Sequence, residues 1–411
     1  MGQIVESFEK VWAEADQLHP PKDFVRLIRK ELESLPWPDR GHEDFKYTNL
    51  SKYLSSPFIS SKKELFQIEN DNAYHTITFI NGFLASKNVD TKSIQISENE
   101  ANSHFLEKPS TQIMSLINWA QGGKTVHIQV LSTCTKPLFI QYIHVGSDSQ
   151  SLIQPRISVA LSPHAKITIL EDTLDMGGSG GLVNKLFMAT LAEGSELNHY
   201  RIQNDGYKST SNGSNQVEVH KDANYNTWHF NLGALLGREV SQIRLLAEGA
   251  RAQLKGLYLS TENRQLDQHI EVFHDSKNTY SKQHFKGILR GKSKAVFNGR
   301  IYVAKDASGV DARQLNNNLL LSSEAEIDTK PELIIENSDV KCSHGATVGQ
   351  LNPDQIFYLM ARGIPAAEAE EIICRAFAEE ILFSIENLDI RKKVTGACAH
   401  VLNQGGKYAP V

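Results

Sequence analysis

The stretch Ser162-Pro-His-Ala-Lys-Ile-Thr-Ile-Leu170 joins a short polar turn to a run in which apolar and polar residues alternate. Alternation with a period of two is typical of a β-strand, and Pro and small polar residues mark turns. Similar turn phrases recur at Ala192-Glu-Gly-Ser195, His220-Lys-Asp-Ala223, Ala247-Glu-Gly-Ala250, Gly291-Lys-Ser293 and Ser323-Glu-Ala325. The first four phrases lie about 27 to 30 residues apart, and the last two are spaced less regularly. This period predicts a solenoid in which each coil holds two or three short strands and their turns.

The same texture extends from about residue 75 to residue 350. Alternating runs such as Val126-His-Ile-Gln-Val130, Val217-Glu-Val219 and Ala295-Val-Phe297 are bounded by Gly, Ser, Asn or Asp, and helical patterns between them are lacking. The lack of helices argues against an α/β barrel or a doubly wound sheet. The Asn-Gly turns that would join the hairpins of a sandwich are scarce. We therefore predict a mainly β chain with a parallel β-helix over residues 75–350, and a large β-sandwich is the alternative.

Helical spacing of apolar residues precedes this region. Phe8, Val11 and Trp12 fall on one stripe, and Phe24 and Ile28 fall on a second stripe after two consecutive prolines. We expect residues 1–74 to form a helical region followed by a packed connector.

Helical signals return after residue 350. Asn352 is suited to cap a helix, and Pro353 suits its first position. The run Arg362-Gly-Ile-Pro365 should end this helix and begin another. The second helix carries an apolar stripe that is more typical of a core than of a partner surface; its members are Ala369, Ile372, Ile373, Ala376, Phe377 and Ile381. We expect residues 351–411 to form a C-terminal helical domain.

The amino-acid composition indicates where the protein is expected to work and which partners it is not expected to bind. The 411 residues are 40% hydrophobic and 22% charged, with a formal charge of -5 and a pI near 6.3, so neither nucleic acid nor an anionic membrane is an expected partner. The sequence shows no targeting signal and no apolar run long enough to span a bilayer. Four scattered cysteines indicate a reducing compartment. We therefore expect a cytoplasmic protein.

Cys342-Ser-His344 places a thiol and an imidazole two residues apart. In an extended strand both side chains point to the same face. Iron and zinc favour thiolate and imidazole ligands. Two ligands make an incomplete site, so the fold or a partner would have to supply the rest. A buried thiol near a hydrogen-bonded histidine is the alternative for this short pattern.

Three long blocks near this pattern carry a family resemblance. They are Asp328-Thr-Lys-Pro-Glu-Leu333, Asp339-Val-Lys-Cys-Ser-His-Gly-Ala-Thr-Val-Gly-Gln350 and Phe357-Tyr-Leu-Met-Ala-Arg-Gly-Ile-Pro365. In content and order they resemble the C-terminal signature of the SufB/SufD family. Weaker similarity extends the resemblance along the chain, at Pro38, Lys46-Tyr-Thr48 and Asn81-Gly82. Gly345 stands where SufB proteins usually have Glu, and extra N-terminal cysteines are lacking, which favours the SufD branch.

The resemblance implies a fold and a role. The fold would be a right-handed parallel β-helix between N-terminal and C-terminal helical regions. The role would be a non-catalytic scaffold subunit of the SUF iron-sulfur cluster assembly complex. The chain would pair with a SufB-like scaffold subunit through the β-helix and bind a SufC-like ATPase through its C-terminal helices. A transient iron-sulfur cluster shared with the partner would form between the scaffolds. Flavin binding, and a homodimer of the chain in isolation, are left open.

The resemblance also assigns residues. It implies that His344 lies at the scaffold interface as a candidate ligand of the nascent cluster, and Cys342, on the same face, could ligate iron or relay sulfur. Phe357, Tyr358 and Arg362 lie near the junction of the two predicted helices and are candidates for the ATPase contact. The chain lacks a Gly-x-x-x-x-Gly-Lys-Ser/Thr loop, so the partner would handle ATP.

Two other functions are alternatives to this role. A SufB-like primary scaffold would build a stable cluster without a partner. A β-helix polysaccharide-active enzyme would need acidic or basic groups that converge in a groove, and no carboxylate pair stands out in the sequence. The other cysteines, Cys134, Cys374 and Cys398, are expected to be core or incidental thiols, with Cys398 in a C-terminal tail.

Overall fold

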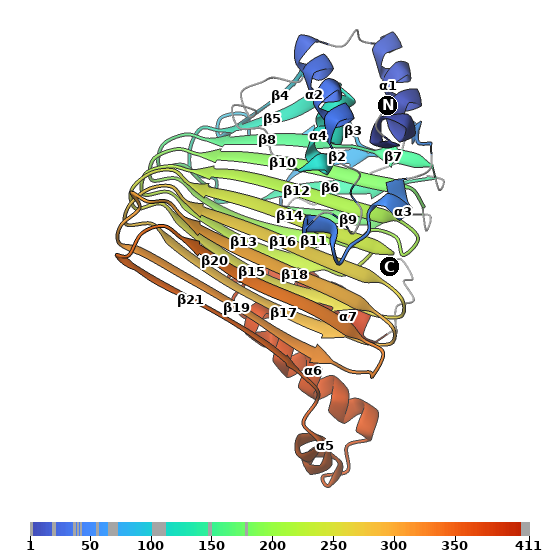
Figure 1. The fold of residues 1–411 in the computed structure, drawn as a ribbon, viewed down its shortest axis with the longest axis vertical. Coiled ribbons are helices and arrows are strands. Elements are labelled where there is room, and N and C mark those ends of the chain that lie inside the picture. The colour runs from blue at the N-terminus through green and yellow to red at the C-terminus, as the bar shows by residue number, and fades with distance from the viewer. Residues whose placement is uncertain are drawn as a thin grey trace.

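Two large β-sheets lie face to face as one stack of coils, with helices toward both ends of the stack (Figure 1). This computed structural model describes residues 3–18, 22–35, 38, 41, 43–54, 57–64, 73–100, 112–146, 150–176 and 180–403. The helices are α1 (Gln3–Leu18), α2 (Asp23–Ser34), the 3-10 helix η1 (Glu43–Phe45), α3 (Ser51–Leu54), α4 (Ile113–Ala120), α5 (Pro353–Met360), α6 (Ala366–Leu382) and α7 (Leu388–Asn403).

From residue 156 onward, successive strands alternate between the two sheets. In spatial order, sheet A holds β4 (Ile94–Glu100), β5 (Lys124–Val130), β8 (Arg156–Leu161), β10 (Leu182–Leu191), β12 (Thr210–Val219), β14 (Leu236–Leu245), β16 (Gln265–His274), β18 (Lys294–Val303) and β20 (Glu326–Ile335), with β1 (Ile59–Ser60) and β7 (Ser151–Ile153) beside this row. Sheet B holds β3 (Phe83–Asn88), β2 (His75–Ile80), β6 (Leu138–His144), β9 (Lys166–Asp175), β11 (Glu196–Gln203), β13 (Asn224–Asn231), β15 (Arg251–Ser260), β17 (Tyr280–Leu289), β19 (Val310–Leu320) and β21 (Val340–Gly349). Neighbouring strands from β8 to β20 and from β6 to β21 are parallel, so each full coil contains one strand of each sheet.

A stack of turns with left-handed backbone joins sheet A to sheet B along one edge. Its residues with positive φ are His164 (61°), Gly194 (66°), Asp222 (54°), Gly249 (75°), Asn278 (55°) and Gly309 (70°). Asn, Asp and His tolerate this conformation better than most residues, and Gly adopts it freely. A Cβ on Gly249 would lie 2.1 Å from Asp222 Oδ1 of the preceding coil, so the glycine leaves room for that side chain. We call this row the turn ladder.

The turn ladder explains the repeat in the sequence. The four regularly spaced phrases all fall on it, between β8 and β9, β10 and β11, β12 and β13, and β14 and β15. The phrases at Gly291 and Ser323 lie instead between β17 and β18 and between β19 and β20, at the opposite edge of the coils. These two phrases are spaced irregularly relative to the first four because they belong to turns at the other edge of the coils.

The space between the sheets is filled by alternate residues of each strand. Next to the turn ladder these inward side chains are apolar and include Ile167, Leu197, Val219 and Leu245. Further from the ladder they become polar, as described below for β9, β11 and β14. The predicted parallel β-helix is thus confirmed, with two strands per coil.

The N-terminal helices cover the outer face of sheet A. Phe8 of α1 and Leu32 of α2 join α4 in one core with Leu186 and Met188 of β10. All eight residues of α4 are buried. This helix lies inside the region predicted to be all β. Its short run Ile-Met-Ser-Leu-Ile-Asn-Trp-Ala is apolar on nearly every side, so periodicity could not separate it from a buried strand.

The C-terminal helices α6 and α7 pack on the outer face of sheet B, and α5 projects from the end of the stack (Figure 1). Trp228 of β13 donates a hydrogen bond from Nε1 to Ser384 Oγ at 2.8 Å. In the predicted apolar stripe of α6, Ala369 and Ile381 are buried but Ile372 is 40% exposed. The third helix, α7, was not expected, and Cys398 lies buried on it instead of in a tail. Among the described residues, no helix has the length and apolar character that a membrane span requires.

Replacement of Gly249 by Ala tests the turn ladder. Ala must adopt a φ of 75° and displace the Asp222 side chain, so we expect a loss of about 1–2 kcal/mol in the free energy of unfolding. Urea denaturation of the purified chain measures the change. A Cβ built on Gly396 of α7 would meet no atom within 4 Å among the residues that the structure describes, and replacement of Gly396 by Ala should be neutral or stabilising. Equal destabilisation by both replacements would contradict this role of the ladder.

Candidate functional site

The last coil of the β-helix leaves two strands at the edges of their sheets. Within the described residues, β20 is the outermost strand of sheet A and β21 the outermost strand of sheet B, and each pairs on one side only. An edge strand presents unpaired backbone N–H and C=O groups. Apolar side chains are exposed here as well, namely Ile334, Ile335 and Val348. We call this surface the open end.

Cys342 and His344 lie on the open end, on the inward face of β21. Their neighbours on β19 are Ala312 and Gln314, which are both buried, and parallel strands in register point such pairs to the same side. Cys342 is partly buried against a small apolar core that includes Val303. His344 is exposed. The two side chains therefore share a face at the last coil, where the interior of the β-helix meets the surface.

Partial burial controls the chemistry of Cys342. Desolvation raises the pKa of the thiol, a backbone hydrogen bond from Ala312 lowers it, and the nearby Asp311 carboxylate raises it; the net shift is upward. The thiolate is the form that binds metal and acts as a nucleophile. In the isolated chain Cys342 is therefore mainly a neutral thiol at neutral pH.

Lys341 and Gly345 lie on the other face of β21. They pair with Asp311 and Leu315 of β19, whose side chains point away from the interior. A Cβ on Gly345 would meet Leu315 Cδ1 at 3.4 Å, which is an ordinary contact. Gly345 therefore does not open space next to Cys342 and His344 on their own face.

The donors at the open end do not complete a metal site by themselves. Among the described residues, no group of three or more His, Cys, Asp or Glu side chains is placed to hold a metal ion. Cys342 and His344 provide one sulfur and one nitrogen donor on a single strand.

Helix α5 presents a second exposed surface. The Asn352 side chain accepts a hydrogen bond from the Asp354 backbone N–H at 2.9 Å and caps the helix as predicted. No residue of α5 is buried; Phe357 is 73% exposed and Tyr358 is 55% exposed. The Arg362 guanidinium lies 3.8 Å from the centre of the Tyr358 ring. Large apolar side chains exposed together on one helix are typical of a protein-binding surface.

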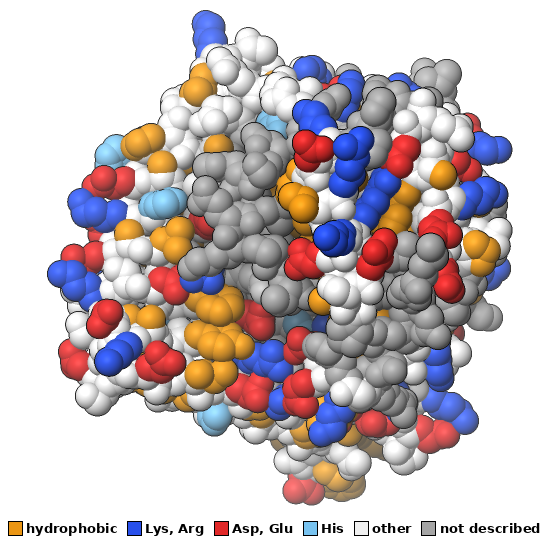
Figure 2. Space-filling view, turned by 45° about the horizontal axis from the view of Figure 1, so that its top comes forward, with side chains coloured by type: hydrophobic (Ala, Val, Ile, Leu, Met, Phe, Trp, Pro, Cys, Tyr) orange, Lys and Arg blue, Asp and Glu red, His pale blue; other side chains and the backbone are white. Residues whose placement is uncertain are grey.

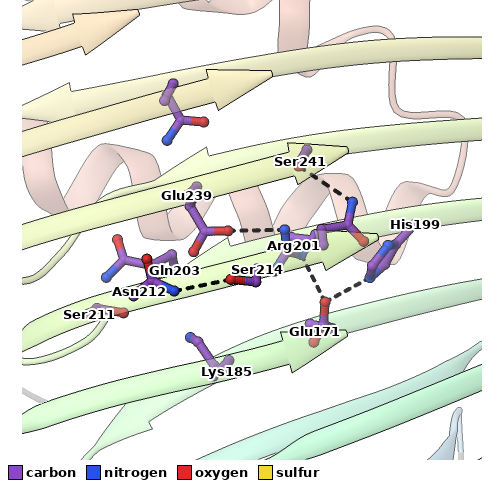
Figure 3. Close-up of polar contacts among 12 residues, drawn as sticks. Glu171, Lys185, His199, Arg201, Gln203, Ser211, Asn212, Ser214, Glu239 and Ser241 are labelled. Atoms are coloured by element: carbon purple, nitrogen blue, oxygen red, sulfur yellow. Dashed lines mark hydrogen bonds and ion pairs between the residues drawn. The ribbon is translucent and has the colours of Figure 1, made fainter. Parts of the chain in front are cut away.

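A buried polar cluster inside the β-helix was missed by sequence reasoning (Figure 3). Glu171 of β9 contacts His199 Nε2 at 2.7 Å and accepts a hydrogen bond from Arg201 Nε at 2.9 Å. Arg201 Nη1 lies 3.0 Å from Glu239 Oε2 of β14. The sequence does show polar residues at the inward positions of the strand 196–203, and this pattern could have indicated a polar interior. The pattern could not show that residues from separate coils would meet.

Burial and ion pairing oppose each other in this cluster. Burial disfavours the charged form of Glu171, but Arg201 and His199 outweigh burial and hold the pKa of this carboxyl below its ordinary value. Burial lowers the pKa of His199. These groups are paired with one another inside the fold, at a distance from the open end, and we assign them a structural role.

The strands of the open end fall within a region of the chain that matches a known protein family. A family model described as "SUF system FeS cluster assembly, SufBD core domain" matches residues 144–377. The chain belongs to the SufB/SufD family. The match covers most of the coils of the β-helix together with β21, α5 and most of α6.

Individual relatives indicate the branch. The iron-sulfur cluster assembly protein SufD of Escherichia coli is 28% identical over 382 residues, which are 90% of each chain. The SufBD family protein slr0076 of Synechocystis is 27% identical over 86% of this chain and 85% of its own length. A SufD of Plasmodium berghei is 26% identical over 90% of this chain and 26% of its own length. The chain is thus a SufD-type member of the SUF system for iron-sulfur cluster assembly.

The pKa shift of Cys342 makes a prediction for the isolated chain. Alkylation by iodoacetamide requires the thiolate, so the rate should be low at neutral pH and should rise through an apparent pKa above that of an ordinary thiol. Mass spectrometry of the peptide that contains Cys342 measures the rate. Cys374 and Cys398 serve as references, since burial raises their pKa to about 11 and about 12. A rate for Cys342 that is already at its plateau at pH 7 would contradict the prediction.

Proposed function

We propose that this chain is a scaffold subunit that pairs with a SufB-like subunit at the open end, so that a nascent iron-sulfur cluster forms between them. The observation that carries the proposal is the position of Cys342 and His344 on an edge strand of an unfinished stack. Membership of the SufB/SufD family supports the same role. The cluster is cargo in this proposal, and the chain is not itself an enzyme.

Strand addition is the proposed mode of pairing. The edges of β20 and β21 would form backbone hydrogen bonds with edge strands of the partner, and Val348 and the side chains around Ile334 would lose their exposure to water. The apolar area and the unpaired edges lie on the same surface, so one partner can satisfy both. Assembly of this kind also explains why a scaffold would leave its last coil uncovered.

The ligand set would then be completed across the interface. His344 offers a nitrogen donor, and Cys342 offers a thiol that becomes a ligand once iron displaces its proton. The raised pKa of Cys342 keeps the thiol protonated until iron arrives. Because Cys342 is partly buried and His344 is exposed, we propose His344 as the first contact.

ATP would act through the C-terminal helices. We propose that a SufC-like ATPase docks on α5 through Phe357, Tyr358 and Arg362. Helix α5 follows β21 by a connection of only a few residues, from Gly349 to Pro353, so a pull on α5 is applied close to Cys342. Pairing of two ATPase subunits would thereby expose the interface between the two scaffold subunits.

The proposed function divides the chain into three parts. Residues 1–74 would be the N-terminal helical region and connector, residues 75–350 the β-helix, and residues 351–411 the domain that docks the ATPase.

Replacement of His344 by Ala should lower cluster formation without loss of assembly. His344 is exposed and contributes no core packing, so the melting temperature and co-purification with both partners should stay unchanged. Even loss of an outer-shell partner lowers metal affinity by about 10–100-fold, so loss of a direct ligand should lower the affinity for iron by at least about tenfold and thereby reduce the iron that the anaerobically reconstituted complex retains. Iron and sulfide analysis measures the effect.

Replacement of His220 by Ala is the matched control. This histidine lies on the turn ladder, far from the open end, and should leave the iron content of the complex unchanged. Equal iron content in the His344 and His220 variants would rule out His344 as a ligand. A stable cluster on the isolated chain, without a partner, would favour the primary-scaffold alternative.

Replacement of Phe357 by Glu should weaken ATPase binding. Central aromatic residues of an interface typically contribute about 2 kcal/mol or more, so the dissociation constant for the ATPase should rise by roughly 30-fold. Calorimetric titration of the full chain measures it. Phe383 is similarly exposed at 63% and also lies near an arginine, Arg391, so Phe383→Glu is the control and should bind normally. The docking site lies elsewhere if both variants bind like the unmodified chain.

A further inference from the structure

A cavity of about 550 Å³ lies at the N-terminal end of the molecule, remote from the open end. Its walls come from α1 and α2, the hairpin of β2 and β3, the loop 121–124 and the start of β8. Figure 2 brings this end forward and shows basic, acidic and apolar side chains mixed on the face. A volume of this size is typical of a site for a small molecule.

Arg156 contributes an uncompensated positive charge to the cavity lining. The Arg156 residue is 97% buried, and its guanidinium lies 4.1 Å from the centre of the Trp119 ring. Arg156 Nε donates to Asn118 Oδ1 at 2.8 Å, and Nη2 donates to the backbone oxygens of Asn118 and Gly122. Among the described residues Nη1 has no hydrogen-bond partner, and no carboxylate forms an ion pair with Arg156. Buried arginines are normally paired, because an isolated buried charge is unfavourable.

Burial has a measurable effect on this group. It lowers the pKa of the Arg156 guanidinium to about 9, with no opposing contribution from an acidic neighbour. An anion next to the guanidinium would remove this penalty.

Other polar groups in the lining also lack partners. Both side-chain amide atoms of Gln154, two residues before Arg156, are buried without a hydrogen-bond partner in the part of the chain that the structure describes. Gly123 has a φ of 76°, and a Cβ there would meet no atom of the described residues within 4 Å, so within that part of the chain this wall opens onto free space. Lys63 adds an exposed cation to the lining.

The acidic residues of the lining do not cancel this charge. Asp16 is paired with Arg29 at 2.7 Å, and Glu98 lies 3.9 Å from Lys124. Glu14 is the third acidic residue in the lining, which also contains Lys22, Lys63, Lys124 and Arg156. Outside these two pairs, the cations Lys63 and Arg156 of the described lining outnumber its one remaining acidic residue, Glu14. Phe79, Leu84 and Val126 supply an apolar part of the wall.

We propose that this cavity binds a small organic anion, whose carboxylate or phosphate group is held near Arg156 and Gln154 and whose apolar body packs against Phe79 and Leu84. The proposal is independent of cluster assembly at the open end. On this proposal the cavity selects its ligand mainly by negative charge and to a lesser extent by shape.

Titration of the full chain with four single-ring probes tests the proposal. Benzoate and phenyl phosphate carry the two candidate head groups, benzyl alcohol is uncharged, and benzylamine is cationic. We expect saturable calorimetric binding and a rise in melting temperature with at least one anion, and neither effect with the other two probes. The anion that binds more tightly identifies the head group. Absence of saturable binding by both anions, or equal binding of benzylamine, would overturn the proposal.

Two variants locate the binding without removal of the buried arginine, whose loss could unfold the chain. Gln154→Glu keeps the side-chain shape and adds a negative charge next to Arg156, and Lys63→Glu reverses an exposed charge in the lining. Each should raise the dissociation constant of the anion by about tenfold. Lys292→Glu makes the same charge change on an exposed turn outside the cavity and should have no effect. If Lys292→Glu weakens binding as much as Lys63→Glu, the anion does not bind in this cavity.

Discussion

Parallel stacking of coils in register is the constraint on which the rest of this structure depends. Each coil satisfies the strand edges of the coil before it and presents two new edges, so the stack must be ended by something other than a further coil. At the N-terminal end the strands β3 and β4 pair antiparallel with β2 and β5, and helices cover the outer face of sheet A. At the other end β20 and β21 have no such cover among the described residues. Cys342 and His344 lie on this uncovered end.

The repeat of the coils could be predicted from the sequence because it is local. A turn phrase followed by an alternating run is visible at each of the four regular coils, and the left-handed residues explain why Gly, Asp, Asn and His recur there. The same local reasoning placed Cys342 and His344 on one face of one strand. It also found the cap at Asn352 and the break at Gly363, whose φ of 84° ends α5.

Features that depend on contacts between residues far apart in the sequence could not be predicted. Glu171, His199 and Glu239 belong to three strands, and only the register of the stack brings them together (Figure 3). Helix α4 is buried on all sides, so its residues show no amphipathic stripe. Gly345 directly follows His344 in the sequence, but alternation along β21 places it on the opposite face. The proposed ligands from a partner would be a property of two chains and could not be read from the sequence of one.

Selective isotope labelling tests the shared site most directly. The chain would be labelled with ¹⁵N in its histidine rings and assembled with unlabelled SufB-like and ATPase subunits. Electron spin echo spectroscopy of the reduced cluster then reports which chain provides a nitrogen ligand. A ligand from His344 predicts a ¹⁵N coupling that disappears in a labelled His344→Ala chain. A spectrum with ¹⁴N coupling alone, or with no nitrogen coupling, would contradict His344 as a ligand of the cluster.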